Sequence, residues 1–202
     1  MDKDWHHDGF SLEALRNGDR EQFSRLVEAY SPLIYRLGVK ILTNPQDAED
    51  VLQETFIKAY RSLKNFDGRS KLSTWLYRIA TNEALMLLRK KRPETVAIED
   101  TQDDPDGNRK PIHIVDWCCL PEEELVSGES LKMLKKAAEN LTASLRLVFV
   151  LRDIEGMSTR ETAEVLDISE AAVKTRLSRA RLQLREDLSA YYADRLEEQN
   201  YE

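Results

Sequence analysis

The chain has 202 residues with only seven glycines and six prolines, which allows one or two domains and excludes a collagen-like or turn-dominated chain. No apolar stretch approaches the roughly 20 residues that a membrane-spanning helix needs. The first ten residues contain three aspartates and no apolar segment, so they do not resemble a signal peptide. These features predict a soluble, cytoplasmic and mainly helical protein.

The formal net charge of −7 is distributed unevenly along the chain. Residues 64–92 hold eight basic and two acidic side chains, whereas residues 93–128 hold two basic and ten acidic ones. Residues 171–185 hold five basic side chains and no acidic one. The acidic average argues against a nucleic-acid partner, but basic segments this concentrated are typical of nucleic-acid-binding surfaces.

Residues 93–128 break the helical pattern, because they contain four prolines and an Asp-Asp-Pro-Asp-Gly run. The segments on either side are rich in helix-forming residues. We therefore predict an all-α fold of two small helical domains joined by a flexible acidic linker. The expected boundaries are 10–92 for the first domain, 93–128 for the linker, 129–187 for the second domain and 188–202 for an acidic tail.

A helix of the first domain is expected to begin at Asn44, with Pro45 at its first helical position. Its apolar face is flanked by a second line of residues at helical spacing. That line consists of Asp50, Gln53, Glu54 and Ile57. Such a stripe is usually a solvated face, but the isoleucine among polar residues favours a contact surface.

A loop at residues 65–71 precedes a second predicted helix, from about Ser73 to Arg92. Its apolar spacing assigns one face to the core: Leu72, Trp75, Leu76, Ile79, Ala80 and Leu87. Another line along this helix holds Arg78, Asn82, Leu85 and Arg89. An asparagine in mid-helix is disfavoured, because its side chain competes for backbone hydrogen bonds. Asn82 is therefore expected either to bond a neighbouring helix or to contact a ligand. The basic end of the helix also suits the helix dipole, so it does not by itself prove a nucleic-acid partner.

The second domain contains the pattern of a helix-turn-helix. Ser158 and Glu161 form a capping box at the start of a short helix, which follows an apolar helix that is expected to end near Gly156. A turn at Asp167–Ile168 leads to a second helix capped by Ser169, with an apolar inner face and a basic outer face. This arrangement predicts a DNA-binding helix-turn-helix.

Four segments, at residues 47–60, 73–82, 157–163 and 172–181, resemble bacterial extracytoplasmic-function (ECF) RNA polymerase sigma factors, in that family's order and spacing. The resemblance covers roughly residues 20–92 and 130–187. It implies a subunit that binds core RNA polymerase and promoter DNA, directs promoter-specific transcription initiation and is controlled by an anti-sigma factor. It also implies that the acidic linker runs along the RNA path of the polymerase.

The resemblance implies three sets of site residues. The polymerase-binding set is Asp47, Asp50, Gln53, Glu54 and Ile57. The set that melts and reads the minus-ten promoter element is Arg69, Lys71, Ser73, Trp75, Arg78, Asn82 and Arg89. The set that reads the minus-thirty-five element is Arg152, Arg160, Lys174, Thr175, Arg176, Ser178 and Arg179. Asn82 is expected to read a flipped base, the arginines to hold phosphates, and Lys174, Thr175 and Ser178 to contact base edges.

No catalytic constellation or phosphate-binding glycine loop occurs in the sequence, so we expect no enzymatic activity, no small-molecule substrate and no cofactor. The histidines lack metal-ligand spacing with Cys118 and Cys119, and we expect no metal site. The two cysteines suggest either a redox switch or, more simply, small linker residues. The acidic tail could cover a basic surface, but solubility is the favoured interpretation.

Two other functions remain open from the sequence. A stand-alone helix-turn-helix regulator would explain residues 157–185 but would leave the basic segment 64–92 without a role. A helical protein–protein adaptor would treat both basic segments as solvated faces.

Overall fold

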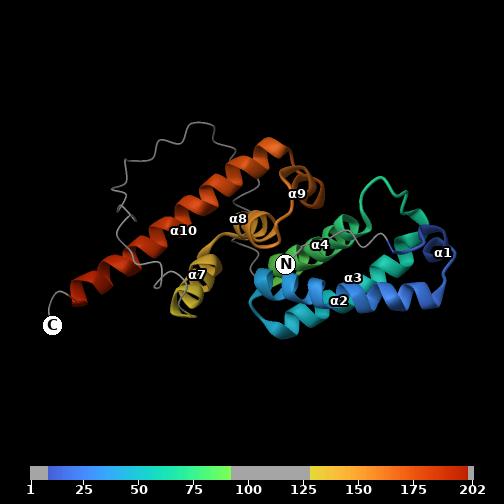
Figure 1. Cartoon of the computed structure of the whole chain (residues 1–202), viewed down its shortest axis with the longest axis horizontal. Helices are drawn as coiled ribbons and strands as arrows, with labels where there is room; N and C mark the ends of the chain where they lie inside the picture. Colours follow the sequence, from blue (N-terminus) through green and yellow to red (C-terminus); the bar gives the residue numbers. More distant parts are fainter. Residues whose placement is uncertain (1–8, 92–127, 200–202) are drawn as a thin grey trace.

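The computed structural model describes residues 9–91 and 128–199, and every regular element within those ranges is a helix (Figure 1). The prediction of an all-α fold is confirmed for these residues. We call residues 9–91 the N-terminal unit and residues 128–199 the C-terminal unit. The expected linker up to residue 127, both cysteines and all three histidines lie outside the described residues. No described helix is long and apolar enough to cross a lipid bilayer.

The N-terminal unit contains four α-helices and one short 3-10 turn. These are α1 (Leu12–Arg16), α2 (Arg20–Leu42), α3 (Pro45–Ser62), the turn η1 (Leu63–Asn65) and α4 (Leu72–Lys91). As predicted, Asn44 caps α3, and its side chain accepts a hydrogen bond from the backbone N–H of Gln46. The expected second helix is α4, which begins one residue earlier than predicted.

Helices α2 and α3 approach each other closely at Gly38. A Cβ atom added to this glycine would lie 3.0 Å from Cβ of Ala48, which is closer than side-chain carbons normally approach. The missing side chain therefore allows the two helices to pack in contact. Around this crossing, Leu26, Ile34 and Leu37 are fully buried.

Helix α4 closes the core of the N-terminal unit. Leu72, Leu76 and Ala80 are buried as the apolar spacing predicted. Trp75, Ile79 and Leu87, which were assigned to the same face, are only half-buried. Tyr77 and Ala84 are buried in their place, so the inner face of α4 is rotated relative to the predicted one.

The C-terminal unit consists of α7 (Gly128–Asn140), α8 (Ala143–Phe149), a π-helical turn η3 (Val150–Ile154), α9 (Thr159–Leu166) and α10 (Glu170–Gln199). Gly156 has φ of +73° and ends the preceding helix. The capping box at the start of α9 is present, with both of its reciprocal hydrogen bonds. Asp167, with φ of +56°, forms the turn before α10, and the Ser169 hydroxyl accepts from the N–H of Ala172. Helices α9 and α10 thus form the predicted helix-turn-helix.

Helix α10 continues beyond the expected end of the second domain. It runs without interruption to Gln199, so most of the acidic tail is a continuation of the second helix of the helix-turn-helix. Figure 1 shows α10 extending away from α9 toward the C-terminus, past α7.

The two units pack against each other. Helix α9 lies on α4, and α8 contacts both α2 and α4 (Figure 1). Four buried residues of the C-terminal unit belong to the same apolar cluster as the core of the N-terminal unit: Leu147, Val150, Leu151 and Val165. This contact brings Lys71 and Arg78 beside the helix-turn-helix.

Candidate nucleic-acid and protein interfaces

The polar stripe on α3 faces solvent. Asp50, Gln53, Glu54 and Ile57 are all exposed, and none of their side chains has a hydrogen bond or ion pair with another described residue. Ile57 has an exposed fraction of 42% and Met86, on the neighbouring α4, of 54%. Folding of the described chain does not explain an apolar side chain at either position, and exposed apolar groups among charges are typical of a protein-binding surface.

A shallow pocket of about 180 Å³ lies beside this stripe, between α3 and α4. Its lining residues combine acidic, apolar and basic side chains: Asp50, Val51, Glu54, Glu83, Met86, Leu87 and Lys90. The residues from α4 were not predicted as part of this site. No signal in the sequence marks Met86, because it follows Ile79 by seven residues, at the spacing of the predicted apolar face.

Asp47 is separated from the other residues that were predicted with it. It is buried, and both of its carboxylate oxygens accept hydrogen bonds of 2.6 Å from Nζ of Lys91. This ion pair joins the first turn of α3 to the last turn of α4. The structure therefore gives Asp47 a role in packing rather than a position on the exposed stripe.

The loop before α4 is fixed at Phe66. The guanidinium of Arg16 donates two hydrogen bonds to the Phe66 carbonyl, at 2.8 and 2.5 Å, and the Phe66 ring lies 4.8 Å from the ring of Trp75. Trp75 is half-buried and Ser73 is buried, whereas Arg69 points into solvent and pairs with Asp67 at 2.9 Å. The loop and the first turn of α4 thus expose Arg69 and part of Trp75 but not Ser73.

Asn82 is exposed at the middle of α4, and its side chain has no hydrogen bond with another described residue. The first sequence interpretation, a bond to a neighbouring helix, therefore does not apply within the described chain. Arg78 and Arg89 are also exposed on α4. The three side chains lie along one side of the helix, and Arg78 pairs there with Asp167 at 3.5 Å.

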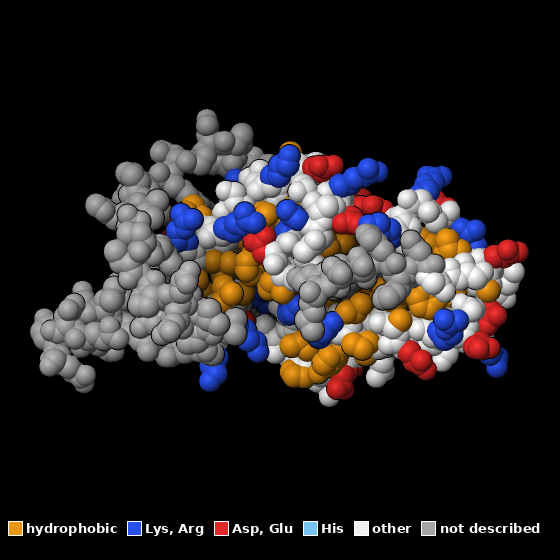
Figure 2. Space-filling view, in the orientation of Figure 1, with side chains coloured by type: hydrophobic (Ala, Val, Ile, Leu, Met, Phe, Trp, Pro, Cys, Tyr) orange, Lys and Arg blue, Asp and Glu red, His pale blue; other side chains and the backbone are white. Residues whose placement is uncertain are grey.

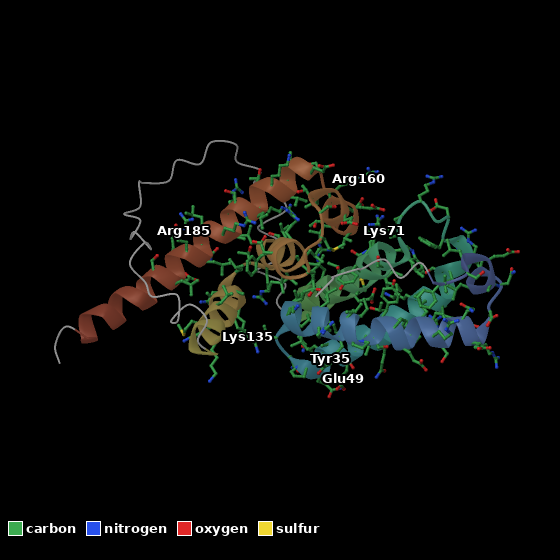
Figure 3. All side chains as sticks on the ribbon, in the orientation of Figure 1. Tyr35, Glu49, Lys71, Lys135, Arg160 and Arg185 are labelled. Carbon is green, nitrogen blue, oxygen red and sulfur yellow. The ribbon has the colours of Figure 1, made fainter. Side chains whose placement is uncertain are left out.

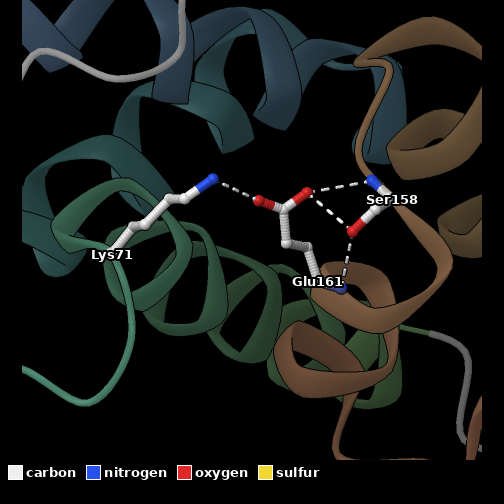
Figure 4. A network of polar contacts seen from close by, with 3 residues as sticks. All are labelled: Lys71, Ser158 and Glu161. Carbon is white, nitrogen blue, oxygen red and sulfur yellow. Dashed lines mark hydrogen bonds and ion pairs between the residues drawn. The ribbon is translucent and has the colours of Figure 1, made fainter.

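Lys71 and Glu161 connect the start of α4 to the start of α9. Nζ of Lys71 lies 2.8 Å from Oε1 of Glu161, whose other oxygen accepts hydrogen bonds from the backbone N–H and the hydroxyl of Ser158 (Figure 4). The hydrogen bond from Lys71 and the backbone N–H of Ser158 lower the pKa of Glu161 from 4.5 to about 2. The carboxylate is therefore charged at any physiological pH.

A buried polar group lies at the centre of the contact between the units. Glu155 is 5% exposed, accepts a hydrogen bond from Nζ of Lys40 at 2.5 Å and accepts another from the hydroxyl of Tyr77 at 3.3 Å. Burial, together with the negative charge of Glu155, raises the pKa of Tyr77 far above its ordinary value, so its hydroxyl stays protonated. None of these three residues was assigned a role from the sequence.

The first turns of α10 present the side chains that were predicted to contact base edges. Lys174, Thr175 and Ser178 are exposed, and the Thr175 hydroxyl donates to the Ala171 carbonyl at 3.0 Å. Figure 2 shows Lys and Arg side chains spaced along α10 on the face in view. This helix end is unobstructed by described residues and could enter a DNA groove.

The predicted phosphate contacts differ in their accessibility. Arg160 is exposed on α9, near Lys71 (Figure 3), while Arg176 and Arg179 are half-buried along α10. Arg152 is half-buried and donates a hydrogen bond to the Met157 carbonyl, so it holds the loop before α9. Arg181, which was not predicted, makes a two-point ion pair with Asp153 at 2.8 and 2.7 Å.

Acidic, cysteine and histidine side chains do not assemble into a metal site in the parts of the chain that the structure describes.

The C-terminal unit contains a helix-turn-helix with a basic outer face. The N-terminal unit has its own basic helix and an exposed acidic-apolar stripe. Together these features define a DNA-binding transcription protein.

Comparison with known families and proteins narrows the class of DNA-binding transcription protein to one family. The family model for sigma-70 region 2 matches residues 26–94, and the model for sigma-70 region 4 matches residues 131–184. The chain is 37% identical to the ECF RNA polymerase sigma factor SigW of Bacillus subtilis, over 88% of this chain and 94% of that protein. It is 34% identical to the ECF RNA polymerase sigma-E factor of Escherichia coli K12, over 84% of this chain and 88% of that protein.

Two solved structures have a similar fold. One is CnrH in complex with the cytosolic domain of CnrY, with a TM-score of 0.63, 26% identity and coverage of 89% of this chain and 95% of that one. The other is the sigma factor RpoE of Bartonella quintana in complex with the anti-sigma factor NepR, with a TM-score of 0.60, 26% identity and coverage of 84% and 98%.

The chain therefore belongs to the ECF RNA polymerase sigma factors. Proteins of this family are transcription initiation factors, which act with core RNA polymerase on promoter DNA inside the cell. The resemblance found in the sequence is confirmed, and a sigma factor is favoured over a stand-alone regulator.

Proposed function

We propose that the two units of this sigma factor divide promoter recognition between them. The N-terminal unit binds core polymerase and melts and reads the minus-ten element, and the C-terminal unit reads the minus-thirty-five element. The protein acts in the cytoplasm, where polymerase and chromosome are, and has no enzymatic activity of its own. The observation that carries this proposal is the presence of separate exposed surfaces of suitable chemistry on α3, α4 and α10.

In this proposal the surface for polymerase is the stripe on α3. Asp50, Gln53, Glu54 and Ile57 are exposed, and their side chains make no hydrogen bond or ion pair with a described residue. The adjoining pocket adds Met86 and Lys90 from α4, so a partner helix with basic and apolar side chains would find complementary groups. Asp47 does not form part of this surface, but its ion pair with Lys91 holds α3 against α4.

The surface for the minus-ten element is the outer side of α4 with the loop before it. A base extruded from the duplex needs a hydrogen-bonding reader and an aromatic or apolar wall. Asn82 supplies an exposed amide, and Trp75 supplies a half-buried ring that is held in place by Phe66. Arg69, Arg78 and Arg89 would hold phosphates and set the register without specifying the sequence.

The surface for the minus-thirty-five element is the first half of α10. Its exposed Lys174, Thr175 and Ser178 have the size and the hydrogen-bonding groups to contact base edges in the major groove. Arg160, Arg176 and Arg179 flank them and would contact phosphates. Arg152 is engaged with the Met157 carbonyl, and its contribution to DNA binding would require that bond to be exchanged.

An anti-sigma factor is the proposed regulatory partner. Two of the solved structures that resemble this chain are complexes, one of CnrH with the cytosolic domain of CnrY and one of a sigma factor with an anti-sigma factor. Both are 26% identical to this chain and are covered over at least 95% of their length.

The direct test is run-off transcription from a promoter library by bacterial core polymerase, with and without this protein. We expect transcripts that share a two-element promoter only when the protein is present. If the folded protein, free of any inhibitor, stimulates no initiation, the proposal is wrong and a stand-alone regulator becomes the better interpretation.

Two variants assign the surfaces. Asn82→Ala is expected to impair promoter opening while polymerase binding is retained, because the amide reads DNA and not protein. Lys174→Ala is expected to weaken recognition of the minus-thirty-five element in closed complexes. The matched control is Lys132→Ala, which removes an exposed lysine from α7 and should leave promoter choice unchanged. Loss of polymerase binding by Asn82→Ala would contradict the assignment of α4.

A further inference from the structure

Arg16 ties the short helix α1 to the loop that precedes α4. Its Nε and Nη2 both donate to the Phe66 carbonyl, at 2.8 and 2.5 Å. Phe66 is the C-cap of η1, where the chain leaves the core and enters the loop. A guanidinium presents its N–H groups in a rigid fork, so two of its donors on one oxygen fix the direction of that carbonyl as well as its position.

Helix α1 is a firm support for Arg16 although it is only five residues long. Leu15 is 3% exposed and belongs to the core of the N-terminal unit, and Leu12 packs against the same cluster. The Ser11 hydroxyl caps the helix by accepting from the N–H of Ala14 at 3.2 Å. Because so short a helix is unstable by itself in water, its contacts with the core and with η1 hold it in place (Figure 1).

Gly68 brings the loop against α1 at a second point. It has φ of +77°, which glycine adopts without strain. A Cβ atom added to it would lie 3.4 Å from Cδ1 of Leu12 and 3.7 Å from Nη2 of Arg16. The hydrogen bonds that residues 67–70 make with described residues stay within the loop, between Asp67 and Arg69. The external support of this loop therefore comes from α1.

The position of Phe66 determines the position of Trp75. Phe66 is 5% exposed, and its ring lies 4.8 Å from the Trp75 ring, with 34° between the two planes. Trp75 is half-buried in the first turn of α4. Asn82 follows it by seven residues, so the two side chains lie on the same side of the helix, about 10 Å apart along its axis. A contact series thus runs from Arg16 through Phe66 to the wall of the surface proposed to read the minus-ten element.

Arg16 differs from the arginines that are proposed to hold phosphates. Arg69, Arg78 and Arg89 are exposed, whereas Arg16 is half-buried and directs two of its nitrogens at a backbone carbonyl. Its charge is therefore used inside the protein rather than presented to DNA.

We propose that Arg16 is a positioning residue of the minus-ten site: by holding the Phe66 carbonyl it fixes the loop and the Trp75 ring against which an extruded base is read. The inference rests on the proposed function of α4 and its loop. It extends the promoter-reading part of the protein to α1, to which no function was assigned. Recognition of one base over another needs side chains held within about 0.5 Å, which a loop without external support does not provide.

The first test measures base preference. Core polymerase with the full-length protein transcribes a run-off library in which the minus-ten element is random and the minus-thirty-five element is constant. At the most selective minus-ten position, Arg16→Met should lower the ratio of preferred to next-best base by about fivefold, within the range that one well-placed base contact contributes. This ratio is taken within one sample, so a smaller folded fraction lowers all transcripts alike and does not change it.

Two further variants separate position from charge. Arg25→Met removes the same charge from an exposed site on α2 whose side chain has no bond with a described residue, and it should leave the ratio unchanged. Arg16→Lys keeps the charge but replaces the forked donors with one ammonium group. Its ratio should lie between those of wild type and Arg16→Met.

The second test measures the loop in the free protein. Trp75 becomes the only tryptophan when Trp5→Phe and Trp117→Phe are introduced into the full-length chain. Arg16→Met should raise the acrylamide quenching of Trp75 fluorescence by about twofold, because a ring released from its packing is more often exposed. Arg25→Met in the same background should show the quenching of the parent protein.

Each failure has a distinct meaning. An unchanged base ratio in Arg16→Met, even with fewer transcripts, would overturn the proposal, because Arg16 would then support only the fold. Unchanged quenching, or an equal loss of preference in Arg25→Met, would overturn it as well. By contrast, minus-ten preference that is insensitive to Asn82→Ala would contradict the assignment of α4 to DNA, while the quenching experiment would still show whether Arg16 holds the loop.

Discussion

The two units differ in how they bury their apolar residues. The N-terminal unit has one continuous core, built from α1 to α4. The C-terminal unit has two small clusters, one around Phe149 and Leu184 and one around Val148 and Val173. Its remaining buried residues, including Leu151 and Val165, join the core of the N-terminal unit.

This difference indicates that the N-terminal unit is self-sufficient and that the C-terminal unit depends on it to bury part of its apolar surface. Small clusters bury little surface, and stability rises with the area removed from water. Separation of the units would therefore expose apolar surface of the C-terminal unit on α8, η3 and α9. Four predictions test this comparison, from the largest expected effect to the smallest.

Leu76→Ala should have the largest effect, because this residue is fully buried in the shared cluster. Removal of a buried leucine side chain costs about 2–5 kcal/mol of unfolding free energy. We expect faster amide hydrogen exchange in both units, since the C-terminal unit packs on the same cluster. The control, Val173→Ala, lies in a cluster of the C-terminal unit alone and should accelerate exchange there only. Unchanged exchange in α8 and α9 of Leu76→Ala would contradict the dependence.

Gly38→Ala should destabilise the N-terminal unit by about 1–3 kcal/mol, as expected for overpacking. Its new Cβ would lie 3.0 Å from Cβ and 3.2 Å from Cα of Ala48, so backbone as well as side chain must move. Thermal unfolding followed by circular dichroism measures the effect. Gly9→Ala is the control, because no atom lies within 4 Å of the added carbon. Equal unfolding temperatures for both variants would show that α2 and α3 have room to separate.

Ser158→Ala should cost about 1 kcal/mol, because it removes the hydroxyl that caps α9. The effect should be confined to α9 and its contact with α4, and residue-specific hydrogen exchange can localise it. Ser169→Ala removes the single cap bond to Ala172 and provides the comparison for α10. Faster exchange throughout the N-terminal unit of Ser158→Ala would mean that this unit relies on α9 for its own stability.

Lys71→Met should have the smallest effect on stability but a clear one on titration. The hydrogen bond from Lys71 is the largest cause of the low pKa of Glu161. Without this bond the pKa of Glu161 should rise from about 2 toward 4.5, while the remaining hydrogen bonds from Ser158 should keep it below 4.5. Because the folded pKa is lowered, the charged carboxylate stabilises the protein above about pH 4.5, and this contribution is lost as the pH falls toward 2.

Carboxyl chemical shifts measured by NMR across this pH range test the expected titration. Lys64→Met, at an exposed position, is the matched control and should leave the pKa of Glu161 unchanged. An unaltered titration in Lys71→Met would show that the two units are already apart in solution.

Features that depend on neighbouring residues could be predicted from the sequence. The caps at Asn44, Ser158 and Ser169 follow from local hydrogen bonding, and the structure contains all three. The exposed stripe of α3 follows from helical spacing, because its apolar residues alternate with its polar ones at the correct period. The helix-turn-helix is likewise a local pattern.

Features that depend on distant residues could not be predicted. Asp47 is buried because Lys91, 44 positions away, covers and neutralises it. The contacts of Glu155 with Lys40 and Tyr77 span 115 and 78 positions, and the contact of Lys71 with Glu161 spans 90. Periodicity within one helix shows which face is apolar but not which polar residue another helix will cover.

Helix α8 and its π-helical turn have a consequence for the tolerance of this protein to mutation. Five consecutive residues, 147–151, are all buried, and they are divided among three apolar clusters. In a library of single substitutions scored for folded protein, intolerant positions along α3 should recur at helical spacing. Along residues 147–151 they should instead form an unbroken run, since no side of this segment faces water.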